Sequence, residues 1–247
     1  VGGDFTTVNG VARSGIARLN ADGTLDTGFT FNPASMPGLT NIAMTHCDDD
    51  EGGPIRVAGK ATYEGSTVGF IARLLHDGSL DTSFANTPSP VPHVVLFNGE
   101  IKGGGGDDTT GVLTLGGTFT QIIGGNNPTR NYLARFSRDG ILDDTFNPPG
   151  PNGPILAVDR QYSTDKLIIG GSFTAYGGVS RSNIARIKWD GSLDTSFNPG
   201  PGTDDAVHAI MYNSQDRKAI IGGTFTTYNG VNRSKIAKIL MEGGANP

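Results

Sequence analysis

Pairs of opposite charge recur along the chain, and they are the side chains whose types and spacing could do chemistry. A basic residue ends each of five similar segments, and in four of them an aspartate follows at the same distance. They could form a ring of charges around a polar ligand, or an ion pair inside each unit. Because a pair found in every unit serves every unit, we favour a scaffold ion pair. The pairs are Arg18 with Asp26, Arg73 with Asp81, Arg135 with Asp143 and Arg186 with Asp194, and Lys238 ends the fifth segment.

Two groups of carboxylates depart from this recurrence and could bind calcium. Calcium takes about six to eight oxygen ligands, so several carboxylates must gather at one point. We expect both groups in enlarged connections between the first two strands of their units, on one face of the fold. The alternative is a pair of solvated acidic loops, and calcium is the one cofactor that this pattern suggests. The residues are Asp48, Asp49, Asp50 and Glu51 in one group, and Asp107 with Asp108 in the other.

Aromatic side chains could stack on the rings of a sugar. Trp189 is the best candidate, because other units carry Ala21, His76 or Arg138 at its position, which indicates that the position tolerates solvent. An exposed tryptophan predicts a contact surface, although single exposed apolar residues are also ordinary. The further candidates are Tyr63, Tyr176, Tyr228 and Phe70.

Recurring Asp-Gly dipeptides are predicted to be turns. They stand at 22–23, 77–78, 139–140 and 190–191. An EF-hand loop needs oxygen ligands at its first, third and fifth positions and a glutamate at its twelfth, which this spacing lacks. Asp-Gly is also a strong hairpin signal. A second set of basic residues is expected to bond to turn carbonyls, namely Arg13, Arg130, Arg181 and Arg233.

No motif for catalysis is found in the sequence. The chain lacks a Gly-x-Ser-x-Gly nucleophile elbow, a His-Glu-x-x-His zinc motif and a phosphate-binding loop. We therefore expect a protein that is not an enzyme. A carboxylate pair for glycoside cleavage stays open at this point, because the separation of two carboxyls is a three-dimensional quantity.

Charge and composition restrict the partners. The net charge is −5, whereas binding to nucleic acid or to an anionic membrane needs a basic face, so neither partner is expected. No apolar run has the length of a transmembrane helix, and we expect no membrane insertion. Cys47 is the single cysteine, so an intrachain disulfide is excluded. The chain opens within a repeat, and we expect it to be a piece of a longer polypeptide.

The five segments belong to a repeat whose pattern predicts β-strands. In the clearest unit, residues 206–212, 218–226 and 234–240 read as successive strands, with Asn229-Gly230 as a hairpin turn. A short fourth strand or corner follows in the other units, as at 192–197. We place the first strand of units two to four at 42–45, 91–97 and 154–158. Residues 98–111, with four consecutive glycines, are then predicted to be an enlarged loop.

Four antiparallel strands, repeated about every fifty residues, are typical of a β-propeller. We expect one all-β propeller domain over residues 1–247, with about five four-stranded blades. The first unit lacks its own first strand, so we expect either a five-bladed ring or an arc of a larger ring. A parallel β-solenoid is the main alternative, but its coils are usually shorter. The approximate units are 1–41, 42–90, 91–153, 154–205 and 206–247.

Residues 169–202, which read IGGSFTAYGGVSRSNIARIKWDGSLDTSFNPGPG, resemble the delta-60 repeat. The match covers almost the whole chain and is weakest in the second unit, where Ala61 replaces phenylalanine. Such repeats resemble segments of large bacterial surface proteins and of phage virion proteins. The resemblance implies a propeller and brings no catalytic residues. It implies an extracellular structural or adhesion module of a bacterial surface or a phage tail or fibre, with protein partners. A lectin-like module that binds glycans, with or without calcium, is the alternative.

Overall fold

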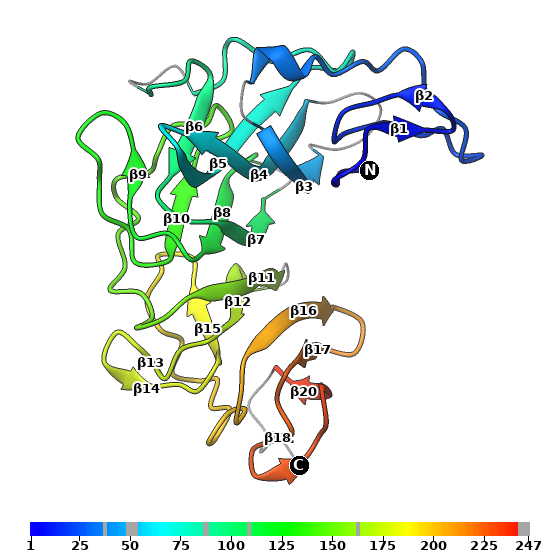
Figure 1. Cartoon of the computed structure of the whole chain (residues 1–247). Helices are drawn as coiled ribbons and strands as arrows, with labels where there is room; N and C mark the ends of the chain where they lie inside the picture. Colours follow the sequence, from blue (N-terminus) through cyan, green and yellow to red (C-terminus); the bar gives the residue numbers. More distant parts are fainter. Residues whose placement is uncertain (37–38, 48–53, 86–88, 108–109, 162–163, 242–247) are drawn as a thin grey trace.

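The computed structural model describes residues 1–36, 39–47, 54–85, 89–107, 110–161 and 164–241, without the side chains of 39–47. These residues form an all-β fold of antiparallel sheets, in which the predicted propeller is confirmed. The units follow one another along an arc, with the first and the last unit at its two ends (Figure 1). A single 3-10 turn, η1 (Pro33–Ser35), is the only helical element in the described part of the chain.

Three-stranded sheets form the third, fourth and fifth units, and the second strand lies in the middle of each. The first strands of these units follow one another along the inner side of the arc (Figure 1). The third unit contains β7 (Ile101–Gly106), β8 (Leu113–Gly117) and β10 (Leu133–Phe136). The fourth contains β11 (Ile155–Gln161), β12 (Lys166–Gly171) and β15 (Ile184–Lys188). The fifth contains β16 (Val207–Asn213), β17 (Lys218–Gly223) and β20 (Ile236–Leu240).

The predicted fourth strand of each unit is reduced to a single antiparallel bridge. In the fourth unit, Leu193 bridges Ile187, and the next residue, Asp194, donates its N–H to the carbonyl of Arg186 at 2.9 Å. This backbone contact carries the aspartate side chain back to the arginine, and it explains why the two residues keep a constant separation in the sequence. The other bridges join Leu19 to Leu25, Leu74 to Leu80 and Phe136 to Leu142.

Short hairpins connect the second and third strands of three units. Each is a two-stranded sheet with a tight turn, as the Asn-Gly and Gly-Gly dipeptides predict. A buried phenylalanine precedes two of them, Phe173 and Phe225. The hairpins are β1 (Thr7–Val8) with β2 (Val11–Ala12), β13 (Ala175–Tyr176) with β14 (Val179–Ser180), and β18 (Thr227–Tyr228) with β19 (Val231–Asn232).

The second unit has a five-stranded sheet, which corrects one prediction. Its strands are β3 (Leu39–Cys47), β4 (Ile55–Tyr63), β5 (Ser66–Leu74), β6 (Val94–Phe97) and β9 (Ile122–Ile123). We predicted 91–97 as the first strand of the third unit, but β6 pairs with β5 of the second unit. The first strand of the third unit is β7, so the four glycines at 103–106 lie in a strand and not in a loop.

A recurring side chain marks where each first strand begins, and it could have revealed the correct assignment. The Oδ1 atom of Asn98 accepts the N–H groups of Thr120 and Gln121, which begin the next hairpin segment. Asn152 and Asp204 make the same pair of bonds in the fourth and fifth units. Each of these residues stands three positions before its first strand, and Asn-Gly-x-Ile occurs at 98–101 and again at 152–155.

The core lies between successive units. Ile168 and Ile184 of the fourth unit share one apolar cluster with Val207 and Ile221 of the fifth. Glycines near the ends of the middle strands β8 and β12 make this contact possible, because a Cβ atom on Gly116 of β8 would collide with Ile155 of β11. A Cβ atom on Gly170 would lie 2.6 Å from Val207 Cγ1 and 2.9 Å from Ile210 Cδ1. Every unit therefore needs a neighbour to complete its core.

Candidate functional site

Each recurring arginine forms the predicted ion pair with the aspartate of its own unit. The Nε–Oδ2 distance is 2.7 Å for Arg73 with Asp81 and also 2.7 Å for Arg186 with Asp194. The arginine side chains are only 7% and 4% exposed in these two pairs. Arg18 with Asp26 and Arg135 with Asp143 have the same arrangement. The prediction of a scaffold ion pair is confirmed for the four units that carry both residues.

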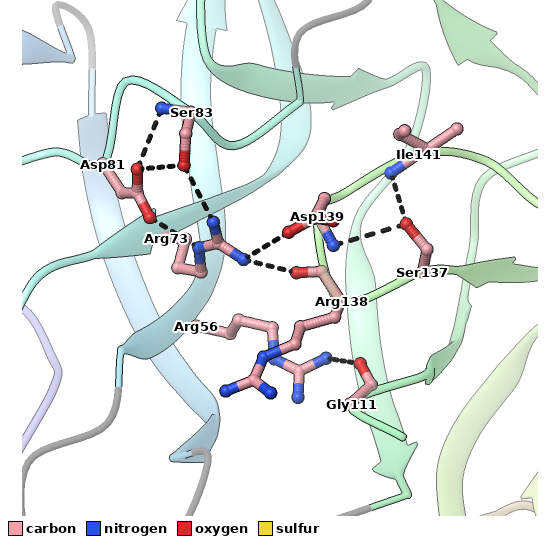
Figure 2. A network of polar contacts seen from close by, with 9 residues as sticks. All are labelled: Arg56, Arg73, Asp81, Ser83, Gly111, Ser137, Arg138, Asp139 and Ile141. Carbon is pink, nitrogen blue, oxygen red and sulfur yellow. Dashed lines mark hydrogen bonds and ion pairs between the residues drawn. The ribbon is translucent and has the colours of Figure 1, made fainter.

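The same arginines also join each unit to the next one, which we did not predict. Arg73 Nη1 donates to the carbonyl of Arg138 at 2.7 Å and contacts the Asp139 carboxylate at 3.2 Å (Figure 2). The acceptor is always the residue directly before the Asp-Gly turn, or its counterpart, in the following unit. The other bonds run from Arg18 to His76, from Arg135 to Trp189 and from Arg186 to Met241.

An aromatic ring completes the arrangement on the arginine face. The guanidinium of Arg135 lies 4.3 Å from the ring centre of Phe146, and that of Arg73 lies 5.3 Å from Phe84. These distances allow a cation–π interaction. Each arginine therefore contacts a carboxylate, a carbonyl of the next unit and a ring of its own unit. We refer to these three contacts as the arginine latch.

Among the described residues of the fifth unit the latch is absent. Lys238 stands in place of the arginine, its side chain is 52% exposed, and it pairs with Asp216.

Burial alone would raise the pKa of Asp81, but hydrogen bonds from Ser83 and Arg73 outweigh it and hold the pKa below its usual range. Asp81 therefore stays ionised at neutral pH and keeps its arginine in place.

The folded protein is expected to lose stability as the pH falls below about 4. The pKa values of Asp81, Asp143 and Asp194 are lowered, and hydrogen bonds from Thr226 lower the pKa of Asp204 to about 2. A carboxyl with a lowered folded pKa stabilises the fold above its unfolded pKa, about 3.9, and this contribution is lost as pH falls through the folded pKa. For Asp204 the loss falls between about pH 4 and about pH 2.

One buried carboxyl acts in the opposite sense. Burial raises the pKa of Asp159, whose carboxylate accepts the Tyr212 N–H at 2.6 Å, so its contribution is greatest at low pH and is lost as the pH rises. Because the carboxyls with a lowered pKa outnumber this raised one, the net effect is acid destabilisation. Urea unfolding followed by Trp189 fluorescence between pH 2.5 and 7 measures it. A midpoint that stays constant over this range would contradict the prediction.

The predicted calcium ligands are only partly within the described residues. Asp48, Asp49, Asp50, Glu51 and Asp108 lie outside them. Asp107 is described, and it forms an ion pair with Arg160 at 2.8 Å. Within the described ranges, no three His, Cys, Asp or Glu side chains lie close enough together to hold a metal ion. The Asp-Gly dipeptides form turns, as predicted, and Asp77 accepts the N–H and hydroxyl of Ser79.

The predicted sugar-stacking rings are mostly buried. Tyr176 and Tyr228 are 0% and 3% exposed, and burial raises both pKa values, that of Tyr228 to about 12. Phe70 is also fully buried. Tyr63 is half-buried at the end of β4 and donates its hydroxyl to Glu64. The prediction that Tyr176 and Tyr228 offer their rings to a sugar is therefore wrong, because both rings fill the core.

Trp189 is half-buried, which corrects the expectation of a solvent-exposed ring. Its ring packs against the core of the fourth unit and lies 5.2 Å from the guanidinium of Arg135 and 5.0 Å from that of Arg160. The tryptophan therefore covers two arginines at the boundary between the third and fourth units. This role follows from its position, because the carbonyl of Trp189 is itself a latch acceptor.

The recurrence of the latch agrees with a comparison against known protein families. The family model for the domain of unknown function (DUF5122) beta-propeller matches residues 1–29, 53–84, 110–146, 163–197 and 214–243. These segments make up more than half of the chain. The chain belongs to this family. No curated protein matches the chain.

Two buried arginines of this DUF5122 propeller break its repeat. Arg56, 1% exposed, lies in β4 and donates to the carbonyl of Gly111 in the third unit at 2.5 Å (Figure 2). Arg160, in β11, pairs with Asp107 and with Asp165 at 2.8 and 2.9 Å. Both join neighbouring units. The sequence could have revealed Arg56, because this basic residue holds the repeat position that the apolar Ile168 holds in the fourth unit.

A pocket of about 250 Å³ lies where the third DUF5122 unit departs from its neighbours. Its walls are mainly apolar, and the lining includes Val95, Ile122, Phe136, Gly140 and Leu142. The connection that forms one wall has nine residues, 121–129, where the fourth unit has six, 175–180. None of the side chains that we predicted as ligand-binding lines this pocket.

No helix among the described residues is long and apolar enough to cross a membrane.

Proposed function

We propose that this DUF5122 propeller is a non-catalytic structural and adhesion module of a bacterial surface protein or a phage virion protein. The arginine latch carries this proposal. It engages the recurring charged side chains with protein groups and ties each unit to the next, which suits a rigid scaffold better than a reaction centre. The resemblance to the delta-60 repeat supports the same setting, the surface of a cell or of a virion.

The scaffold would hold irregular segments in a constant orientation for a partner protein of the same assembly. The best described example is the connection 121–129, which is longer than its counterparts and is held at its ends. Arg130 contributes through an ion pair with Asp144 at 2.8 Å and a bond to the carbonyl of Thr129. Rigid scaffolds commonly present their binding residues on connections of this kind.

Immunogold labelling tests the proposed location. Antibodies against the purified chain should label intact cells of the source culture, or phage particles purified from it. Label that appears only after the cells are permeabilised would contradict the proposal. Antibodies first absorbed with the purified chain are the control for specificity.

A glycan array tests the carbohydrate-binding alternative in the same material. Because Tyr176 and Tyr228 are buried, we expect no binding, with or without calcium. Reproducible binding to one glycan class would replace the structural proposal by a lectin-like one.

A further inference from the structure

In the fourth unit, where the repeat is regular, the side chain of Tyr176 fills the space that corresponds to the third-unit pocket. In the fourth unit its ring is fully buried, and its hydroxyl donates to the carbonyl of Gly191 at 2.5 Å. It shares an apolar cluster with Ile187, and Leu193 packs against that cluster. The third-unit counterparts of Gly191, Ile187 and Leu193 are Gly140, Phe136 and Leu142. All three line the pocket.

Ile122 occupies the tyrosine position in the third unit. Both residues pair with the chain just before the first strand, Tyr176 with Pro151 and Ile122 with Phe97. The bonds of Asn152 and Asn98 hold these segments in the same register. An isoleucine has neither the ring nor the hydroxyl of tyrosine. The longer connection 121–129 then borders the space instead of filling it, because Gly124, Gly125 and Pro128 are part of the lining.

We propose that this pocket binds a phenol group supplied by a ligand, in the place that a tyrosine takes in the fourth unit. The ring of the ligand would pack against Val95, Phe136 and Leu142. Its hydroxyl would donate to the carbonyl of Gly140, as Tyr176 donates to Gly191. The size is sufficient, since an apolar cavity of about 150 Å³ already binds benzene. The site does not depend on the structural role proposed above.

The probe is 4-methylphenol, which is the tyrosine side chain without its backbone. We expect the full chain to bind one equivalent, with a dissociation constant on the order of 1 mM or below, measured by ligand-observed NMR and calorimetry. Ile122→Tyr should fill the pocket from within, so it should bind none and should unfold at a higher temperature. Tyr176→Ile is the matched variant, because it should open the equivalent space in the fourth unit and bind two equivalents.

Absence of binding to the unsubstituted chain would overturn the proposal, as would binding that Ile122→Tyr retains. The hydroxyl is tested with 4-methylanisole, which has the same ring but cannot donate and should bind about tenfold more weakly. Equal binding of the two compounds would overturn the assignment to the Gly140 carbonyl. A blocked Gly-Tyr-Gly peptide identifies the source of the phenol. Binding as tight as that of 4-methylphenol supports a tyrosine of a partner protein, and weaker binding supports a small phenolic compound.

Discussion

Replacing Arg73 by methionine is expected to lower the free energy of unfolding by about 3–5 kcal/mol. The variant keeps most of the apolar stem but leaves Asp81, 10% exposed, without its guanidinium. It also removes the bonds to Ser83 and to the Arg138 carbonyl, so the second and third units lose a direct connection. Urea unfolding at pH 7, followed by circular dichroism, gives the change in free energy.

Lys238→Met is the matched control for this substitution. Lys238 holds the same repeat position, but its side chain is half exposed and pairs with Asp216 at the surface. Exposed pairs contribute about 0–1 kcal/mol, so this variant should stay close to the unsubstituted chain. Arg73→Lys should give an intermediate loss, because an ammonium cannot reproduce the fork geometry of the guanidinium. Equal losses for Arg73→Met and Lys238→Met would refute the latch as a stabilising element.

Gly170→Ala is expected to destabilise the protein by about 1–3 kcal/mol through overpacking. The added methyl group would lie 2.6 Å from Val207 Cγ1 and 3.0 Å from Val207 Cβ, both in the first strand of the fifth unit. Either β16 must move away from the fourth unit, or the side chains of the shared cluster must change rotamer. The effect therefore reports on the packing between units and not on the strand alone. Thermal unfolding of the purified variant measures it.

Gly222→Ala makes the same change in the fifth unit and serves as the control. A Cβ atom there would meet nothing closer than 3.8 Å. Alanine also loses less backbone freedom on folding than glycine does, so this variant should be neutral or slightly stabilised. If both substitutions lower the melting temperature equally, the glycines act through strand propensity and the proposed packing is wrong.

Features set by short-range chemistry were predicted correctly from the sequence. Three of the four Asp-Gly dipeptides form turns in which the aspartate, Asp22, Asp77 or Asp190, accepts the N–H two residues ahead. In the fourth, Ser137 accepts the N–H of Ile141 instead. Arg181 and Arg233 donate to the carbonyls of the residues directly before them, as the spacing suggested. The ion pair of each unit also follows from a nearby contact, since one bridge folds the aspartate back onto its arginine.

Features that depend on the neighbouring unit were missed or placed wrongly. The carbonyl that accepts the latch bond lies in the next unit, so no local pattern marks it. The segment 91–97 has the alternation of a first strand, yet its strand β6 extends the sheet of the second unit. The first strand of the third unit is β7, in which Gly103 and Gly105 lie close to β11 of the next unit and Gly104 lies against Leu115 of β8. Tyr176 was a candidate for stacking on a sugar, but the Asp-Gly turn of its own unit covers its ring.

The sequence by itself determined most of the strands, the turns and the all-β repeat, because alternation and turn residues act over a few positions, whereas the glycine-rich strand β7 carries no such signal. The tertiary structure alone decided which side chains are buried. Ile184 and Ile236 belong to nearly the same motif, yet Ile184 is 0% exposed and Ile236 is 62% exposed. The difference arises because the fifth unit covers Ile184, whereas no described unit packs over Ile236. In a repeat protein, burial is a property of the contact between units, and it is absent from the sequence of any one of them.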